Sequence, residues 1–586
     1  MKLRKRHEYH PRTSQAPRLE VAAAAVSSEK MSSHSSGPDN VEKAKDRRNM
    51  ARDSTTLTSE DNEVQPSTEL SPESEYITGL RLYAVLTGLT LVMLLIMLDQ
   101  TIVVTAIPRI TNRFNSIKDI GWYGSAYLLS LAALQPLQGK IYTYYTSKKI
   151  FLTTLFIFEV GSLICALANS SAMLIIGRAI TGIGSSGLLI GSLTILSAAA
   201  PNDKRPLYIG IMLGIASLGL VLGPVLGGLF TQHATWRWCF WLNLPIGGIT
   251  GTILGLMRIP DSKLIAPKKG TPKEQVKRLD LPGFAFFTPT CIMLLLALEW
   301  GGVTYSWNSA TIIGLFCGAG GACIIFLFWE SRQGETAMIP IRLLKNRVVV
   351  TACLTTAFSQ GSLILVTYYL PVWFQVVLGA SPTMGGVDYL PSVGAQIVVS
   401  IATGALTTRT GLPTPFAILG CALTSISCGL LSTLTTHSPT AHWIGYQILL
   451  GASRGLTMQQ PIAAISAVIP QSQLAVGNSL IMFTNVLGGA MFVSFGQTVF
   501  SNQLKGALKH FAPDVDAEAV LRVGATAFRS VVGPGQVGEV VRAYNRALTR
   551  VLYLGAGASV ASFVAAWGMG WTNLKTKKVD EKDGKV

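Results

Sequence analysis

Long apolar runs between residues 80 and 573 constrain the fold of this chain more than any other feature. A helix needs about 20 apolar residues to cross the hydrocarbon core of a bilayer, because each residue advances it by about 1.5 Å. Only 13% of the 586 residues are charged, and most of these lie in the tails or between the apolar runs. A water-soluble protein of this length would need far more polar surface, so we expect an all-α membrane protein.

The apolar runs predict fourteen membrane-spanning helices. We place them at residues 84–107, 122–141, 150–168, 173–199, 208–230, 239–257, 282–299, 309–329, 348–370, 385–406, 412–434, 442–466, 476–500 and 550–571. An even number of spans puts both ends of the chain on one side of the membrane. Connections on that side carry 17 Lys and Arg residues, against 4 in the short connections opposite. Because basic residues are retained in the cytoplasm, both ends are expected there.

The same pattern predicts the order of domains. We expect a disordered cytoplasmic tail at 1–80, a six-helix bundle at 81–258, a cytoplasmic linker at 259–281, two inserted helices at 282–330, a second six-helix bundle at 331–573 and a cytoplasmic tail at 574–586. The second bundle contains a long outer loop at 501–549, for which a structural cap is favoured over a partner-binding role. The longest apolar run near the start, VAAAAV at 21–26, is too short for a signal peptide.

Several classes of function are disfavoured by what the sequence contains. The net charge of +17 is distributed as membrane topology requires rather than as a nucleic-acid surface. The eight cysteines form no CxxC pair, so neither a disulfide framework nor a metal centre is expected. The ATP-binding pattern GxxxxGK[ST] is absent, and no histidines or paired carboxylates cluster as an enzyme would need. We therefore expect no bound cofactor.

Two charged residues inside the spans are the main functional candidates. Asp99, in LDQTIVVTAIP at 98–108, lies about 12 Å from the outer end of the first span, and Arg178, in GRAITGIGSSG at 177–187, lies about 8 Å from that of the fourth. A charge in hydrocarbon costs several kcal/mol unless it meets a partner or a cavity, so we expect the two to pair. A carboxylate at that depth can exchange a proton in the physiological range. A structural ion pair, or an aspartate that packs near a helix break at Pro108, is the alternative.

Four other ionisable residues in the spans are less decisive. Arg454, in GASRGLTMQQP at 451–461, stands in the fourth helix of the second bundle and echoes GRAITG, which suggests an internal duplication. Its role is open between substrate binding and packing. Glu159 in the third span is open between a protonated carboxyl and a hydrogen bond between helices. Glu299 and Asp388 lie near outer span ends, where capping or snorkelling is the default.

Glycine and proline mark places where helices meet or bend. GIASLGLVLGPVLGGLF at 214–230 contains Gly223, Pro224, Gly227 and Gly228, whose spacing permits close helix contact and a bend. Tight packing is expected, and a gating role is a hypothesis. The ninth span is expected to break at Pro371, beside aromatic residues divided between an interfacial belt and a cavity lining.

A candidate substrate cavity is built from polar and aromatic residues of the spans. Its members are Gln100, Tyr127, Gln135, Tyr368, Tyr369, Gln375, Arg454 and Asn485. Asn169-Ser170-Ser171 is a formal glycosylation sequon in a minimal outer loop. That position is too close to the membrane for modification to be expected.

Four ordered segments of the chain resemble the fourteen-span drug:proton antiporter family of the major facilitator superfamily. They are LDQTIVVTAIP in the first span, GRAITGIGSSG in the fourth, LGPVLGGLF in the fifth and WRWCFWLNLPIGG at 236–248. The resemblance covers residues 80–573, and the segment 139–171 is similar to fungal exporters of toxins and secondary metabolites. It implies two six-helix bundles that rock about a central cavity, with Asp99 and Arg178 at the proton-coupling positions.

One segment departs from the family pattern. The loop between the second and third spans usually reads GxLaDrxGrk, but here it is GKIYTYYTSKK at 139–149. Thr143 holds the acidic position, while Lys148 and Lys149 keep the basic end. The usual charge relay at the cytoplasmic gate is therefore in doubt, and other contacts are expected to close it.

The resemblance implies proton-coupled export of an amphipathic small molecule by alternating access. The expected partners are that molecule, protons and the lipid bilayer, without nucleic acid, for a monomer in the plasma membrane or alternatively in the vacuolar membrane. Siderophore or basic amino-acid transport by the same fold is the first alternative. A nutrient sensor that has lost transport is another, and a membrane-embedded enzyme a third.

Overall fold

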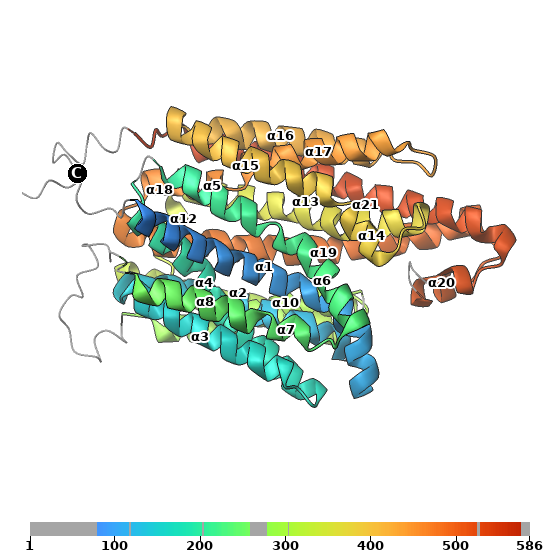
Figure 1. The fold of residues 1–586 in the computed structure, drawn as a ribbon, viewed down its shortest axis with the longest axis horizontal. Coiled ribbons are helices and arrows are strands. Elements are labelled where there is room, and N and C mark those ends of the chain that lie inside the picture. The colour runs from blue at the N-terminus through green and yellow to red at the C-terminus, as the bar shows by residue number, and fades with distance from the viewer. Residues whose placement is uncertain are drawn as a thin grey trace, which may run out of the picture. The chain divides into compact units, whose positions relative to one another are not determined.

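The computed structural model describes residues 79–116, 119–201, 204–257, 259, 278–302, 304–523 and 528–575, which are almost entirely helical (Figure 1). The tails and linker expected at 1–80, 259–281 and 574–586 fall almost wholly outside these ranges. We call the end of the helices at which α1 begins the tail-side end, and the opposite end the loop-side end.

The first half of the chain forms one packed group of helices. Its elements are α1 (Leu80–Phe114), α2 (Ile120–Tyr144), α3 (Ser147–Ala166), α4 (Ser171–Ala199), α5 (Arg205–Ala216), α6 (Gly219–His233), α7 (Trp238–Trp241) and α8 (Asn243–Leu256). α5 and α6 together cross at the fifth expected span, and α7 and α8 at the sixth. Within this group α4 packs on α2 and α3, while α1 packs on α6 and α8.

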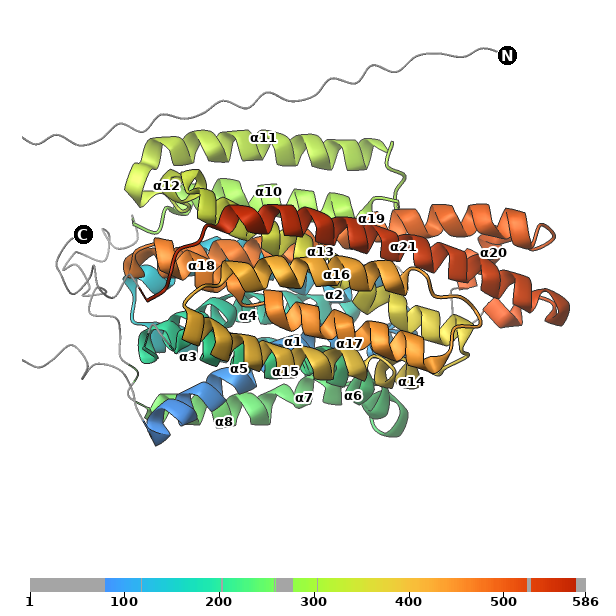
Figure 2. The same cartoon turned by 90° about the horizontal axis from the view of Figure 1, so that it is seen from above.

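A helical pair and a second group follow. The pair is α10 (Leu281–Trp300) and α11 (Ala310–Gln333). The second group consists of α12 (Ile341–Lys345), α13 (Arg347–Val377), α14 (Pro382–Val387), α15 (Leu390–Thr410), α16 (Thr414–Leu431), α17 (Thr440–Thr457), α18 (Gln460–Val468), α19 (Leu474–Phe511), α20 (Ala517–Val523) and α21 (Val537–Ala566). α10 packs on both α2 and α19, and α11 lies beside α10 at the edge of the bundle (Figure 2).

Twelve helices of the described residues are long and apolar enough to cross a membrane, so the expected count of fourteen is not confirmed. The two expected spans missing from the twelve are those at α2 and at α17–α18. Both contain glutamines and other polar residues that lower their hydropathy. The middle of α2 is mostly buried by neighbouring helices, so it does not need an apolar surface for lipid.

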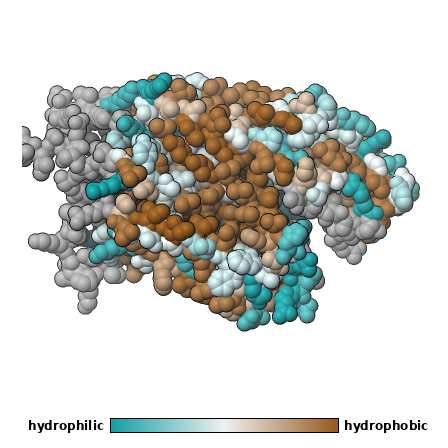
Figure 3. All heavy atoms as spheres, viewed as in Figure 1, coloured by the Kyte–Doolittle hydropathy of each residue, from teal (hydrophilic) through white to brown (hydrophobic). Residues whose placement is uncertain are grey.

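Apolar side chains cover the middle of the helices on the face that Figure 3 shows, as a bilayer requires. Figure 3 shows hydrophobic residues over the middle of one face and hydrophilic residues toward both ends. α11 illustrates the cause, because only 17% of its most apolar stretch is buried and Ile324 and Phe328 are exposed. Large apolar side chains are stable at such positions when lipid covers them.

Four helices extend well beyond their expected spans. α1 continues through Pro108 to Phe114, and α13 continues through Pro371 to Val377, so the breaks expected at these prolines are wrong. A proline removes one backbone hydrogen bond, and a long helix packed on its neighbours tolerates that loss. Much of the outer loop expected at 501–549 is helix, because α19 runs to Phe511 and α21 begins at Val537.

The helical extensions pack over the loop-side end of the second group. The Trp373 indole Nε1–H donates to Asn545 Oδ1 at 2.7 Å, and the Asn545 amide donates to the Leu434 carbonyl at 3.2 Å. Arg529 donates to the carbonyl of Val376 at 2.9 Å. These bonds connect α21 and the segment before it to α13 and to the turn after α16.

Candidate functional site

A buried ion pair joins α1 to α4. The Arg178 Nη1–H donates to Asp99 Oδ2 at 2.6 Å, and the two side chains are 1% and 0% exposed. α4 begins where the Ser170 hydroxyl accepts from the Met173 amide, which places Arg178 two turns inside the helix. Counting residues from the outer span ends predicted similar depths for Asp99 and Arg178, and the structure brings them into contact.

Tyrosines of α2 complete the surroundings of Arg178. Its Nε–H donates to the Tyr123 carbonyl at 3.0 Å, and its guanidinium carbon lies 4.5 Å from the centre of the Tyr127 ring. The Tyr127 hydroxyl donates to Ser185 at 2.8 Å, and Gln100 also interacts with this hydroxyl. A cation over an aromatic face is attracted by the ring's quadrupole. Arg178 is therefore held by one charge, one carbonyl and one ring.

Asn243 holds the other oxygen of the carboxylate and was not predicted. Its Nδ2 donates to Asp99 Oδ1 at 2.9 Å and to Ser162 Oγ at 3.0 Å, so α8 and α3 also reach the ion pair. Asn243 is fully buried at the first position of α8. The signal available in the sequence was a lone amide inside WRWCFWLNLPIGG, where an unpaired polar group would be costly.

Glu159 stands one helical turn from Ser162 on α3. Both of its carboxyl oxygens are buried without a hydrogen-bond partner among the described residues. Gly247 of α8 makes room for it, because a Cβ there would lie 2.5 Å from the Glu159 carboxyl carbon. Of the two alternatives left open, the hydrogen bond between helices is not found among the described residues.

The glycines of α6 position the helix that carries Asp99. Thr101 donates to the Gly219 carbonyl at 3.1 Å. A Cβ added at Gly223 would lie 2.9 Å from the Ile102 amide nitrogen, so only glycine permits this approach. Gly227 continues the same contact a turn later, whereas Pro224 and Gly228 are half-buried. α1 and α6 are thus in backbone contact beside the ion pair.

The residues of the candidate cavity do not all meet. Gln100 and Tyr127 lie at the ion pair, whereas Gln135 is fully buried in α2 with both amide atoms unpartnered among the described residues. Tyr368 is 53% exposed, and Tyr369 donates to Gln497 of α19 at 3.3 Å.

The remaining cavity candidates lie in the second group. Asn485 donates to Gln360 of α13 at 3.3 Å, and Gln375 lies against Gly385 of α14. Arg454 of α17 interacts with the hydroxyl of Tyr389, the residue that precedes α15.

The two groups contact each other at the tail-side end through glycine backbones and hydrogen bonds. A Cβ at Gly139 of α2 would lie 3.1 Å from the Ala475 carbonyl oxygen of α19, and the Ser400 hydroxyl of α15 donates to the Gly210 carbonyl at 3.0 Å. Arg205 also donates to Gln471 at 3.3 Å. The two groups are therefore in backbone contact at this end.

Thr143 and Lys148 of the altered inner loop bond within the first group, whereas Lys140 donates to the Thr336 carbonyl at 3.5 Å, in the segment before α12. The Thr143 hydroxyl donates to the Gly139 carbonyl of its own helix at 2.8 Å. Lys148 donates to the Gly255 and Met257 carbonyls at 2.6 and 2.7 Å, which caps α8, and Lys149 is exposed. Neither the Thr143 bond nor the Lys148 bonds cross to the second group.

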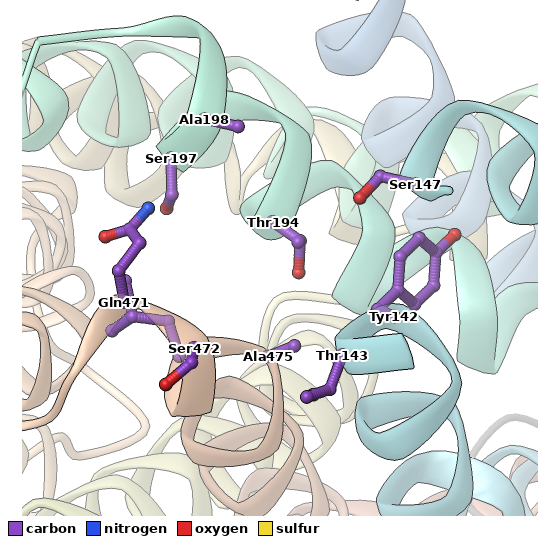
Figure 4. Close-up of a pocket in the computed structure, with 10 residues that line it drawn as sticks. Tyr142, Thr143, Ser147, Thr194, Ser197, Ala198, Gln471, Ser472 and Ala475 are labelled. Carbon is purple, nitrogen blue, oxygen red and sulfur yellow. The ribbon is translucent and has the colours of Figure 1, made fainter. Parts of the chain in front are cut away.

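A small pocket opens at the tail-side end, between α2, α4 and the start of α19 (Figure 4). Tyr142 and Thr143 line one side, and Gln471 and Ser472 the other. Two glycines lie close to its walls, because Gly191 contacts Tyr142 and Gly139 contacts Ala475. The pocket is separate from the buried ion pair and adjoins the closed contact between the groups.

Comparison with known families decides what this fold is. Residues 89–493 match the Major Facilitator Superfamily profile. The chain belongs to the major facilitator superfamily. It is thus a multi-pass membrane transporter of small molecules and not an enzyme, which confirms the family resemblance.

Similar proteins extend the match to nearly the whole length. This facilitator is 47% identical over 506 residues to the efflux pump mokI of Monascus pilosus, across 85% of its own length and 93% of the relative. It is 46% identical over 513 residues to the efflux pump mlcE of Penicillium citrinum, across 86% and 93%. It is 44% identical over 506 residues to the MFS-type efflux pump MFS1 of Trichophyton rubrum, across 86% and 94%.

Solved structures agree with the fold. The proton:xylose symporter XylE aligns with a TM-score of 0.55 at 14% identity, covering 84% of this facilitator and 98% of the symporter. A bacterial homolog of the human lysosomal transporter Spinster aligns with a TM-score of 0.51 at 16% identity, covering 85% and 99%. Identities this low support the shared helical architecture alone.

Proposed function

We propose that this facilitator is a proton-coupled antiporter that exports an amphipathic secondary metabolite or toxin by alternating access. Export is supported by near-full-length similarity to fungal efflux pumps. Energy comes from the proton gradient, because the sequence contains no ATP-binding pattern.

The Asp99–Arg178 pair is the observation that carries the proposal. Both charges are sealed from water at 0% and 1% exposure, so neither is stable there without the other. Protonation of Asp99 removes the negative charge and leaves Arg178 with a carbonyl and an aromatic ring. Arg178 must then find other partners, which requires α4 to move relative to α1. One proton can in this way change the relative stability of two conformations.

The contacts around the pair connect its charge to helix packing. Asn243 ties Asp99 to α8 and α3, and the glycines Gly223 and Gly227 tie the same helix to α6. A proton on Asp99 changes the acceptor that Asn243 meets as well as the partner of Arg178. We propose that α6 slides or separates from α1 when this happens, with Pro224 and Gly228 supplying the bend.

The closed end is the cytoplasmic gate in this proposal. The conformation is occluded from the cytoplasm by the glycine contacts at Gly139 and Gly210 rather than by a charge relay. Lys148 and Lys149 then act in capping and in topology. For cargo to enter from the cytoplasm, α2 must separate from α19 and α5 from α15.

The membrane arrangement completes the proposal. We propose fourteen spans, with α2 and α17–α18 added to the twelve apolar helices, and both tails in the cytoplasm of a plasma-membrane monomer. The domains are a first bundle at 81–258, the inserted pair at 282–330 and a second bundle at 331–573. The cargo contacts are drawn from Gln100, Tyr127, Gln135, Tyr368, Tyr369, Gln375, Arg454 and Asn485.

Efflux from inverted or reconstituted vesicles tests the proposal. Asp99→Asn keeps the shape of the side chain but cannot exchange a proton, so proton-driven efflux should fall at least about tenfold. Glu299→Gln is the matched control, because it removes a carboxyl of another span that forms no ion pair with Arg178 among the described residues. The control should export like wild type. Full proton-driven efflux by Asp99→Asn would overturn the coupling.

A further inference from the structure

The second group of helices contains a counterpart of the Arg178 site. Arg178, on the fourth helix of the first group, lies over Tyr127 of the second helix and close to Cys165 of the third. Arg454, on α17, interacts with Tyr389 at the start of α15 and lies close to Cys428 of α16. α17 packs on both α15 and α16, as α4 packs on both α2 and α3 (Figures 1 and 2).

One component of the first site is missing from the second. Asp99 has no acidic counterpart on α13, and Asp388 is the only Asp or Glu between residues 347 and 511. Asp388 lies in the short connection before α15, where its backbone carbonyl accepts from Gln447, and within the described residues no ion pair joins it to Arg454. The last helix contributes only Glu539, in its first turn at the loop-side end.

Among the described residues, Arg454 is therefore a cation without a counter-charge. Its Nη1 is buried and has no hydrogen-bond partner in the part of the chain that the structure describes. The Tyr389 hydroxyl, which also bonds Thr367 of α13 at 3.1 Å, is its polar neighbour. A guanidinium left unpaired in a low-dielectric site costs several kcal/mol, and the planar fork of its N–H groups fits a carboxylate in two hydrogen bonds.

We propose that Arg454 binds the carboxylate of an anionic amphipathic cargo, in the place that an aspartate occupies in the first half. The inference rests on the proposed export function and adds a substrate class to it. The two halves then divide the work, since the first arginine pairs with a carboxylate of the protein and the second with a carboxylate of the ligand. Tyr389 and Thr367 supply further hydroxyls beside the bound group.

Thermal unfolding of the purified full-length protein tests the proposal with two matched probes, decanoate and decanol. The probes share one apolar chain and differ in the charge of the head group. Decanoate should raise the Tm of wild type by about 2 °C or more beyond decanol, because ligands stabilise the state that binds them. Titration should show that Arg454→Gln binds decanoate at least about tenfold more weakly, with decanol unchanged.

Two further variants separate charge from structure. Arg454→Lys keeps the charge without the fork and should fall between wild type and Arg454→Gln. Arg409→Gln, which removes an exposed guanidinium from the end of α15, should behave as wild type. If Arg454→Gln does not fold, the proposal is still tested by comparing the Tm shifts from decanoate and decanol in wild type and in Arg454→Lys.

Equal effects of decanoate and decanol on wild type would overturn the proposal. So would an undiminished preference for decanoate in Arg454→Gln. A chloride titration distinguishes a carboxylate cargo from an inorganic anion. If chloride raises the Tm in an Arg454-dependent way and decanoate adds no further increase, the site binds an inorganic ion and the cargo assignment is overturned. Asp99→Asn should keep the decanoate preference, so loss of the coupling mechanism and loss of this subsite are separate results.

Discussion

Removing the charge of Asp99 while keeping its shape should destabilise the folded transporter. Asn243 can still donate to the Oδ1 of Asp99→Asn, so the bond at 2.9 Å survives. The other end of the new side chain presents an amide, a donor, to the Arg178 Nη1–H that met a carboxylate oxygen at 2.6 Å. Two donors then face each other, and a buried guanidinium has lost its counter-charge.

The magnitude follows from the burial of both partners. Breaking a buried ion pair from one side costs about 3–5 kcal/mol, because the remaining charge stays out of water. Removing both charges, as in Asp99→Asn with Arg178→Gln, should leave the protein within about 2 kcal/mol of wild type. The tyrosine carbonyl and the ring beside Arg178 offset only part of the single loss, since neither carries a full charge.

Unfolding of the purified protein in detergent, as wild type, two single variants and the double variant, measures this difference. The coupling energy between the two sites should be at least about 2 kcal/mol and favourable. If Asp99→Asn is as stable as wild type, or if the double variant is no more stable than Asp99→Asn, the pair does not neutralise Arg178. The reasoning on charge exchange would then fail as well.

The remaining predictions concern the gate and the Asn243 hydrogen bonds beside the pair. Gly139→Leu should reduce efflux at least about tenfold with little change in expression, because a side chain there meets the backbone of α19 and blocks closure. Gly124→Leu, on the same helix with open space around it, should export normally. Equal loss of efflux in both variants would contradict the gate. Asn243→Leu should lower stability by about 1–3 kcal/mol in thermal unfolding, since it leaves Asp99 Oδ1 and Ser162 without their donor; an unchanged Tm would show that the amide does not support the pair.

The sequence contained the helices and the pair but not the way the pair is held. Apolar length alone located a helix at each expected span, and counting residues placed Asp99 and Arg178 at similar depths. Asn243 escaped because one amide in an apolar helix has no periodic signal, and its role depends on the rotation of α8 against α1. The glycines of α6 predicted close packing between helices. They did not predict that the contact of Gly223 with Ile102 positions α1.

Other expectations failed for reasons of tertiary context. Pro108 and Pro371 were expected to break helices, but packing along α1 and α13 outweighs one lost hydrogen bond. Hydropathy also separates α2 from the apolar spans, because neighbouring helices rather than lipid cover its polar residues. The cavity candidates divide among several contacts, since residue type alone does not give the direction in which a side chain points.

Proton movement driven by cargo is the most direct test of coupled exchange. Proteoliposomes containing the wild-type transporter and a pH-sensitive dye, with no initial pH difference, would receive a gradient of a transported amphipathic compound. The account predicts that protons move opposite to the cargo, and that Asp99→Asn abolishes this movement. Cargo flux through wild type with no change in internal pH would contradict the account.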